Sequence, residues 1–382
     1  MKRLLAALAV FLAAALPVRA QSLAVRHYDT DDGLGHNLVN GVLQDHEGYV
    51  WIATYEGLSR FDGVQFVTYG VRDGFPHAIV SGLAEDAFGR LWVANFSGGL
   101  SPITDDRIHP VGTPLHVGPS EHSNELMAVV ASRDGALWCV AADGVYRGRA
   151  RGQTFDFERV IDIPSDVSLP PVLQDRAGHV WAGIDDKALR FSSGRVDTFE
   201  IPSKAYAAPV AAFTEDAAGR VYVATSRGIF AADRPGPAAT TRWEPVPVAL
   251  PAGEQVRSLL SSTSGRLWIG TTRRVWLREP GSGPRPMRIR GLDDAVKILY
   301  EDHDGNVWVG TERSGVYLIP RDLVEVFSTE DGLARPVVRR VVEGIDGRIY
   351  AEGDGGVVEV GAAGLQPIAG ANSPRAVPIK ER

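Results

Sequence analysis

An aromatic residue flanked by apolar residues recurs eight times along the chain, at intervals of 40 to 46 residues. A glycine stands three residues before each copy, and an aspartate or serine stands six residues before seven of the eight. The eight aromatic residues are Trp51, Trp92, Trp138, Trp181, Tyr222, Trp268, Trp308 and Tyr350. A period in the low forties is typical of β-propeller blades and of some helical repeats, so the chain is restricted to repeat architectures of these two kinds.

The segments around each aromatic residue favour strands over helices. In the first copy, VLQD, HEG and YVWIAT read as strand, turn and strand. Aspartate or serine can accept backbone N–H groups at the start of such a turn, and glycine adopts positive φ at its end. Segments such as LWVAN and VWVGT are rich in the β-branched and aromatic residues that strands prefer. A third and a fourth strand segment follow, as in GLSRFD and VQFVTY, so each repeat predicts a four-stranded antiparallel propeller blade.

The repeated aromatic residues are predicted to form the core between blades. A four-stranded sheet cannot bury both faces alone, whereas radial stacking places each ring between adjacent sheets and removes about 150–250 Å² per ring from water. The Asp–Gly turns are interpreted as structural, because most copies offer one carboxylate and a calcium loop needs several oxygen ligands. The sequence therefore predicts an all-β propeller with no metal and no cofactor.

The number of blades is open between seven and eight. The favoured arrangement has seven blades within residues 21–326, and the eighth repeat, residues 327–369, is an extra blade or the start of a second propeller. Residues 26–30, RHYDT, resemble a lone fourth strand that could pair with the last blade and close the ring, leaving fewer exposed edges. An eight-bladed ring closed in the same way is the alternative. Residues 370–382 show no strand pattern and are expected to form a loose tail.

Residues 1–20 have the three parts of a secretory signal peptide. Two cationic residues precede an apolar run from Leu4 to Leu16, and a small-residue cleavage site follows, with cleavage expected after Ala20. Removal of this segment takes away three cationic residues and changes the net charge from -7 to -10. We therefore expect an exported protein that is periplasmic or secreted and has no membrane span in its mature chain.

The charge and the single cysteine restrict the function further. An acidic chain is a poor candidate for nucleic-acid binding, since that affinity depends largely on cationic contacts to phosphate. Cys139 is the only cysteine, so no intrachain disulfide can form. It lies in the apolar segment ALWCVA, and we expect a buried structural thiol rather than a nucleophile.

The repeats resemble those of the two-component regulator propeller family. The match is closest in VLQDHEGYVWIATYEGLSRFDG and good in GLAEDAFGRLWVANFSGGL and LYEDHDGNVWVGTERSGVYLI. The resemblance implies a periplasmic sensor region of a bacterial signal-transduction receptor that binds a small extracellular ligand, often a glycan. Family members commonly carry two seven-bladed rings, a membrane helix and an output domain. With eight repeats, this chain is expected to be a free periplasmic binding subunit or a truncated receptor, with a membrane-bound receptor or kinase as its partner.

Three functional classes remain open on the sequence. The first is a non-enzymatic, ligand-sensing propeller, which the resemblance favours. The second is an enzyme, because the streptogramin B lyase family has propeller repeats of a similar kind. A lyase needs a positioned base, and none of the nine histidines forms a pair spaced as metal ligands in one strand. The third is a protein–protein interaction module. Several histidines converging at the mouth of the channel would favour the enzyme.

The candidate ligand-binding face is formed by the loops that follow each aromatic strand and those that enter each blade, since loops on a rigid scaffold commonly carry binding residues. Tyr55 and Phe96 could stack on sugar rings, and the arginines could bind a carboxylate or sulfate through paired hydrogen bonds. The candidate residues are Asn37, Tyr55, Glu56, His77, Asn95, Phe96, Arg227, Arg273, Arg274 and Arg313, with His36, Asp185, Lys187 and Glu312 on the same face.

Overall fold

The structure is a computed structural model that divides into two compact units, Val25–Asp322 and Met1–Ala24 with Leu323–Arg382. The predicted signal peptide, its cleavage site, the C-terminal tail and Arg227 lie outside the described residues. The structure describes residues 22–104, 107–108, 115–151, 154–163, 171–192, 194–202, 209–226, 228–322, 325–326, 333, 335, 337–361 and 364–368.

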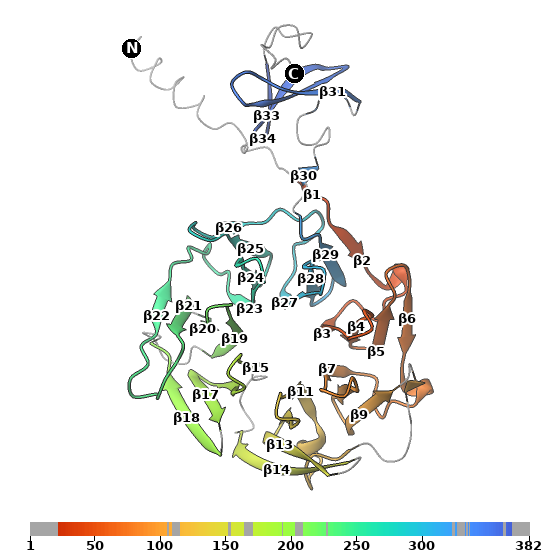
Figure 1. Ribbon diagram of the computed structural model, residues 1–382. Coiled ribbons are helices and arrows are strands. Elements are labelled where there is room, and N and C mark those ends of the chain that lie inside the picture. Colours follow the sequence, from red (N-terminus) through yellow and green to blue (C-terminus); the bar gives the residue numbers. More distant parts are fainter. Residues whose placement is uncertain are drawn as a thin grey trace, which may run out of the picture. The chain divides into compact units, whose positions relative to one another are not determined.

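The unit Val25–Asp322 contains seven four-stranded antiparallel sheets arranged radially around a common axis (Figure 1). The sheets are formed by β3 (Val39–Gln44), β4 (Val50–Thr54), β5 (Gly57–Phe61) and β6 (Phe66–Tyr69); β7 (Val80–Glu85), β8 (Leu91–Asn95), β9 (Gly99–Thr104) and β10 (Arg107–Ile108); β11 (Leu126–Ala131), β12 (Leu137–Ala141), β13 (Gly144–Arg151) and β14 (Thr154–Asp162); β15 (Val172–Gln174), β16 (Val180–Ile184), β17 (Lys187–Ser192) and β18 (Arg195–Glu200); β19 (Val210–Glu215), β20 (Arg220–Thr225), β21 (Gly228–Asp233) and β22 (Glu244–Val246); β23 (Val256–Ser261), β24 (Leu267–Thr271), β25 (Val275–Arg278) and β26 (Arg285–Pro286); and β27 (Val296–Glu301), β28 (Val307–Thr311) and β29 (Val316–Ile319) with β2 (Arg26–Tyr28).

The prediction of an all-β propeller is confirmed. The described residues contain no α-helix, and the helical segments among them are the three-residue 3-10 turns η1 (Thr30–Asp32), η2 (Val71–Asp73) and η3 (His122–Asn124). Within these residues, no helix has the length and apolar character needed to cross a bilayer.

The first strand of the unit completes the sheet of the seventh repeat. β2 pairs antiparallel with β29, with His27 opposite Tyr317, and becomes the outer strand of the sheet that holds Trp308. The sequence segment VEVFST, residues 324–329, also has the pattern of a fourth strand for this repeat, but its described part does not join the sheet. β2 occupies the free edge of β29, and β30 (Glu325–Val326) pairs instead with β1 (Ser22–Leu23) in the other unit.

The Asp–Gly turn has a second role beyond its turn geometry. In the first repeat, one carboxylate oxygen of Asp45 accepts the backbone N–H groups of Glu47 (3.0 Å) and Tyr49 (2.9 Å). The other oxygen accepts the indole N–H of Trp51. Asp86, Asp175, Asp216 and Asp302 likewise accept from the repeated aromatic residue six positions later. Each carboxylate thus connects the turn to the repeated aromatic ring. The eight turn glycines have φ between 76° and 97°, a region that glycine adopts readily.

The sixth repeat carries a serine in place of this aspartate. Ser262 bonds to Ser264 and to the backbone of Arg266, and the buried indole N–H of Trp268 has no acceptor within the described residues. An unsatisfied buried donor costs about 1–3 kcal/mol.

We expect Ser262→Asp to stabilise the propeller by about 1 kcal/mol, since the carboxylate would accept the Trp268 indole N–H while losing part of that gain to its own burial. Urea unfolding at pH 7 measures the change. Ser262→Ala serves as the control, because it removes the hydroxyl without offering an acceptor. An unfolding midpoint of Ser262→Asp at or below that of Ser262→Ala would contradict the prediction.

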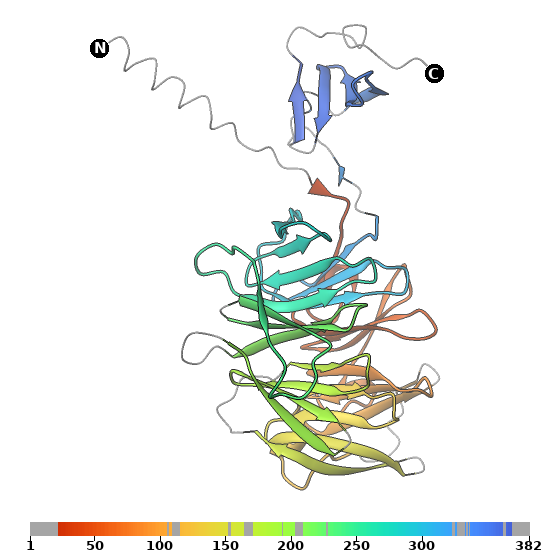
Figure 2. The same ribbon diagram turned by 60° about the vertical axis from the view of Figure 1, so that its left-hand side comes forward.

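The core lies between neighbouring sheets. Trp51 of the first sheet packs with Val80 and Val93 of the second, and Trp308 of the seventh packs with Val42 and Phe61 of the first. Figure 2, turned by 60°, shows neighbouring sheets facing each other around the ring. Among the repeated aromatic residues, seven are buried, at 8% exposure or less, and Tyr222 is half-buried.

Cys139 lies inside this core. Its side chain is fully buried in the cluster between the second and third sheets, and burial raises the pKa of the thiol. The thiolate, which is the nucleophilic form, is therefore disfavoured at neutral pH.

The other unit holds the eighth repeat. β31 (Val338–Glu343), β32 (Ile349–Gly353), β33 (Gly356–Gly361) and β34 (Gly364–Pro367) form a single four-stranded sheet in which Tyr350 is buried against Val357. The described part of this unit contains no second four-stranded sheet, and Val341 and Ile345 are 61% and 66% exposed.

Candidate functional site: a cavity on the propeller axis

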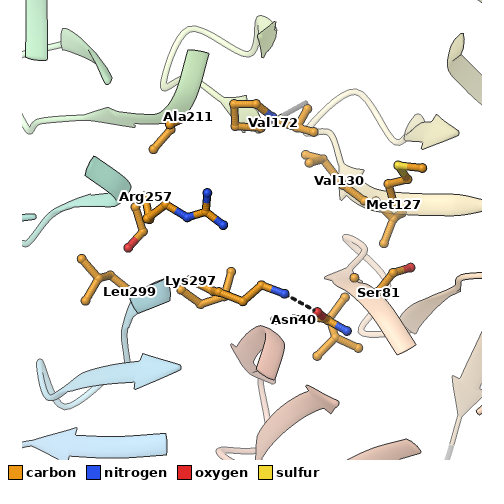
Figure 3. Close-up of a pocket in the computed structure, with 18 of the residues that line it drawn as sticks. Asn40, Ser81, Met127, Val130, Val172, Ala211, Arg257, Lys297 and Leu299 are labelled. Carbon is orange, nitrogen blue, oxygen red and sulfur yellow. Dashed lines mark hydrogen bonds between the residues drawn. The ribbon is translucent and has the colours of Figure 1, made fainter. Parts of the chain in front are cut away.

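A cavity of about 620 Å³ lies on the axis of the ring and is lined by the inner strand of every sheet. Figure 3 shows side chains from these strands pointing into it. Drug-sized ligands commonly occupy cavities of roughly 300–1,000 Å³. The labelled lining residues are Asn40, Ser81, Met127, Val130, Val172, Ala211, Arg257, Lys297 and Leu299.

Six of the inner strands aim one residue into the cavity through a shift in register. In β3, Val39 pairs with Thr54 and Gly41 pairs with Ala53, so Asn40 is the extra residue between them. The same shift occurs in β7, β11, β19, β23 and β27. Such β-bulges redirect side chains and are frequent beside functional sites. The extra residues are Asn40, Ser81, Met127, Ala211, Arg257 and Lys297, and all six line the cavity.

Sequence reasoning missed these positions, although a signal was present. Each extra residue stands eleven positions before the repeated aromatic residue. In β3 and β27 the buried apolar residues are three apart, as in Val39 and Val42 or Val296 and Leu299, rather than the two expected for a regular strand. That spacing predicts one extra residue, and its side chain varies from blade to blade.

Two cations enter the cavity from neighbouring sheets. Lys297 donates to Asn40 Oδ1 at 2.8 Å, and Asn40 in turn donates to the Val80 carbonyl at 2.9 Å. Arg257 forms no hydrogen bond or ion pair with the described part of the chain. Burial lowers the pKa of the Lys297 ammonium, nearby Arg257 lowers it further, and Glu312 acts in the opposite direction. The cationic side of the cavity therefore retains unused donors.

The predicted aromatic residues Tyr55 and Phe96 also line the cavity, and they are 46% and 38% exposed. Their backbone N–H groups donate to the carbonyls of Leu38 and Ile79, which fixes both residues where β3 and β7 begin. His36 and His77 lie beside them, with ring centroids 5.5 Å from Tyr55 and 6.0 Å from Phe96. We call Tyr55, Phe96, His36 and His77 the aromatic rim.

Three predicted arginines are paired with carboxylates and do not line the cavity. Arg273 forms two contacts to Asp293, at 3.0 and 3.2 Å. Arg274 lies 3.5 Å from Glu254, and Arg313 lies 3.3 Å from Asp294. The hydrogen bonds between these two side chains raise the pKa of Arg273 and lower the pKa of Asp293. These guanidinium groups therefore have less capacity for a ligand anion than the sequence indicates.

Asn95 requires a correction, because it does not lie on the loop face. It is the last residue of β8, it is fully buried, and its amide donates to Gly99 and Ser101. The amide N–H groups thus donate within the adjoining hairpin and do not face a ligand.

The remaining predicted residues lie outside the cavity lining. Asn37 accepts the Thr30 N–H at 3.0 Å and so supports the chain before the first sheet. Glu56, Asp185, Lys187 and Glu312 are exposed. The structure thus brings together Tyr55 and Phe96 with four polar residues that sequence reasoning did not identify, namely Asn40, Ser81, Arg257 and Lys297.

The histidines do not converge in the cavity. None of the described histidines lines it, and within the described chain no group of three or more His, Cys, Asp or Glu is arranged to hold a metal ion. The Nδ1 atoms of His36 and His77 accept the N–H groups of Leu38 and Ile79, at 2.9 and 3.1 Å. In the neutral imidazole the proton then resides on Nε2, so neither ring retains a free lone pair for proton abstraction.

A second cavity, of about 610 Å³, lies between the third and fourth sheets and is rich in arginine. Its cations already have protein partners, since Arg147 pairs with Asp134 and Arg149 pairs with Glu158. The axial cavity is therefore the better candidate site.

Residues 33–56 and 291–313 match the family described as two component regulator propeller. These two stretches are two component regulator propeller repeats. Each stretch contains one copy of the turn-and-aromatic motif, which ends at Trp51 in the first repeat and at Trp308 in the seventh. No curated protein matches the chain.

Solved structures similar to this chain include extracellular domains of two component and one component systems and a lyase. The extracellular domain of a candidate hybrid two component system from B. thetaiotaomicron has a TM-score of 0.69 and 19% identity, over 91% of this chain and 50% of that one. The extracellular domain of a candidate one component system from the same organism has a TM-score of 0.62 and 15% identity, over 90% and 52%.

A streptogramin B lyase has a TM-score of 0.63 and 13% identity, over 78% of this chain and 97% of that one. At these identities the similarity establishes the propeller fold. The chain spans about half the length of the two extracellular domains.

Proposed function

We propose that this protein is an exported, non-enzymatic propeller that binds a small extracellular ligand in its axial cavity as part of a bacterial signal-transduction system. The observation that carries the proposal is the cavity of about 620 Å³, whose lining combines the aromatic side chains of Tyr55 and Phe96 with two inward-pointing cations. A mostly apolar cavity with a few convergent polar groups is the usual form of a ligand site.

Two further observations support this assignment. The two component regulator propeller repeats and the similarity to extracellular sensor domains favour a periplasmic or secreted sensor over other propeller functions. Communication with a membrane-bound receptor or kinase is part of the same proposal. The cationic N-terminal segment followed by an apolar run supports export.

The chemistry of the cavity favours binding over turnover. A lyase requires a general base within hydrogen-bonding distance of its substrate. Within the described lining, the ionisable groups are Arg257, Lys297 and the Tyr55 phenol, and the nearby His36 and His77 have their Nδ1 lone pairs engaged. Because the described lining contains no carboxylate and no histidine, this arrangement favours recognition through cations and stacking surfaces.

Calorimetric titration of the mature protein against a panel of neutral sugars, uronic acids, amino acids and aromatic acids tests the proposal. We expect at least one compound to bind, and Tyr55→Ala with Phe96→Ala to weaken that binding by about 5- to 150-fold, since stacking on each ring contributes about 0.5–1.5 kcal/mol. Phe88→Ala is the matched control, because Phe88 is 79% exposed and lies outside the cavity lining.

Two results would contradict the proposal. Equal weakening by Phe88→Ala and by the rim variant would show that the cavity is not the site. Mass spectrometry of the same mixtures reports turnover, and a product that disappears in His36→Ala or His77→Ala would assign the protein to the enzymes instead.

A further inference from the structure

The cationic pair in the cavity is unlike the other cations near this face. Arg273, Arg274 and Arg313 each have a carboxylate partner, whereas Arg257 has neither a hydrogen bond nor an ion pair within the described residues. Lys297 is bonded to the neutral oxygen of Asn40. Arg257 acts on Lys297 as a like charge, and an anion placed between the two would offset that repulsion.

The opposite side of the cavity is apolar. Met127 and Val130 face the space across from Arg257 and Lys297, and Val172 and Ala211 continue the apolar lining between the two sides (Figure 3). The described lining contains no carboxylate. A ligand that fills the cavity therefore meets cationic donors on one side and hydrocarbon on the other.

We propose that the axial cavity selects a small monoanionic ligand with an apolar body, whose carboxylate lies between Arg257 and Lys297. This inference rests on the proposed function, because it names the ligand class of the same cavity. The charge count favours a single negative charge, since Arg257 and Lys297 contribute two positive charges and Glu312, which acts on Lys297 from outside the lining, contributes one negative charge. Guanidinium recognises a carboxylate through paired hydrogen bonds, and the Lys297 ammonium supplies a further donor.

The ligand class implies a pH dependence with a defined sign. Arg257 and Glu312 are the charged groups that act on Lys297, and burial holds the pKa of its ammonium below the usual 10.5. A bound carboxylate favours the ammonium and raises this pKa, so binding takes up a proton above the lowered value. Affinity is therefore full below the lowered pKa and falls as the pH rises through it. Lys297→Arg keeps the charge at all accessible pH values and should lose this alkaline decline.

Calorimetric titration of the mature protein at pH 7 with matched probes tests the inference. The probes are 3-phenylpropionate and D-glucuronate, each compared with its neutral counterpart, 3-phenylpropionamide or D-glucose. We expect 3-phenylpropionate to bind most tightly and at least about tenfold more tightly than its amide. Arg257→Met with Lys297→Met should weaken 3-phenylpropionate binding by roughly 30- to 100-fold and leave the amide nearly unchanged, because methionine preserves the apolar stems.

Arg273→Met with Arg274→Met is the matched control, since it also removes two cations but leaves the cavity lining intact. It should change the affinity less than about twofold.

Equal binding of acid and amide, or equal weakening by both double variants, would overturn the anionic ligand class while leaving a ligand-binding propeller. Tighter binding of D-glucuronate than of 3-phenylpropionate would contradict the inference that the ligand has an apolar body. Absence of binding by these probes together with binding of a neutral compound from the wider panel would refute the inference alone, and absence of all binding would contradict the proposed function as well.

Discussion

Trp308→Ala is expected to lower the free energy of unfolding by about 3–5 kcal/mol, the usual cost of truncating a large buried aromatic side chain. Trp308 is 2% exposed, and its ring lies 5.8 Å from Phe61 and 6.3 Å from Tyr28. Phe61 belongs to the first sheet, and Tyr28 belongs to the strand that completes the seventh. The substitution therefore leaves a void at the position where the chain's first and last propeller strands meet.

Urea unfolding followed by tryptophan fluorescence and by circular dichroism measures this loss. Phe88→Ala is a matched control, because it also removes an aromatic ring but from a side chain that is 79% exposed. We expect the control to change stability by less than about 0.5 kcal/mol. Similar midpoints for the two variants would show that Trp308 does not join the seventh and first sheets.

Asp86→Ala is expected to destabilise the propeller by about 3 kcal/mol at pH 7. The Asp86 side chain is 6% exposed and accepts from the backbone of Phe88 (2.9 Å) and Arg90 (3.1 Å) and from the Trp92 indole (2.8 Å). Removing the carboxylate leaves these donors without an acceptor, at about 1–3 kcal/mol for each that stays buried. Asp86→Asn should cost less, since its amide oxygen can still accept.

The same carboxylate predicts how the effect depends on pH. Burial by itself would raise the pKa of Asp86, but the hydrogen bonds from Trp92, Phe88 and Arg90 outweigh it and hold the pKa below its usual value of 3.8. A carboxyl group with a lowered folded-state pKa stabilises the fold above its unfolded pKa, and this contribution is lost as the pH falls through the folded value. The difference in unfolding free energy between wild type and Asp86→Ala should therefore shrink below about pH 3.8. A constant difference between pH 7 and pH 3 would contradict this account.

The candidate site could be predicted only in part. Tyr55 and Phe96 are recognisable as loop aromatics four residues after the repeated tryptophans, and the structure places both in the cavity lining. The arginines that the sequence favoured are engaged by Asp293, Glu254 and Asp294. Glu254 pairs with Arg274, and Asp294 pairs with Arg313, from the loop before the first strand and the loop after the second strand of one sheet. Asp293 and Arg273 come from loops of neighbouring repeats, so each of the three pairs depends on how separate loops fold.

The sequence by itself determined the repeat and most of its local structure. Strand lengths, turn glycines and buried aromatic positions depend on contacts between residues a few positions apart, such as Asp86 and Trp92, and the same short pattern recurs in each copy. Only the tertiary structure decided that the first strand closes the ring at the seventh repeat rather than the eighth, because the pairing of Tyr28 with Val316 joins segments almost 290 residues apart. The tertiary structure alone also placed Arg257 and Lys297 in one cavity on the axis. Each is the extra residue of an inner strand, and the two strands belong to different repeats. The physical reason is that local hydrogen bonding fixes each blade, whereas the closure of the ring and the charges on its axis depend on the packing of blades far apart in the chain.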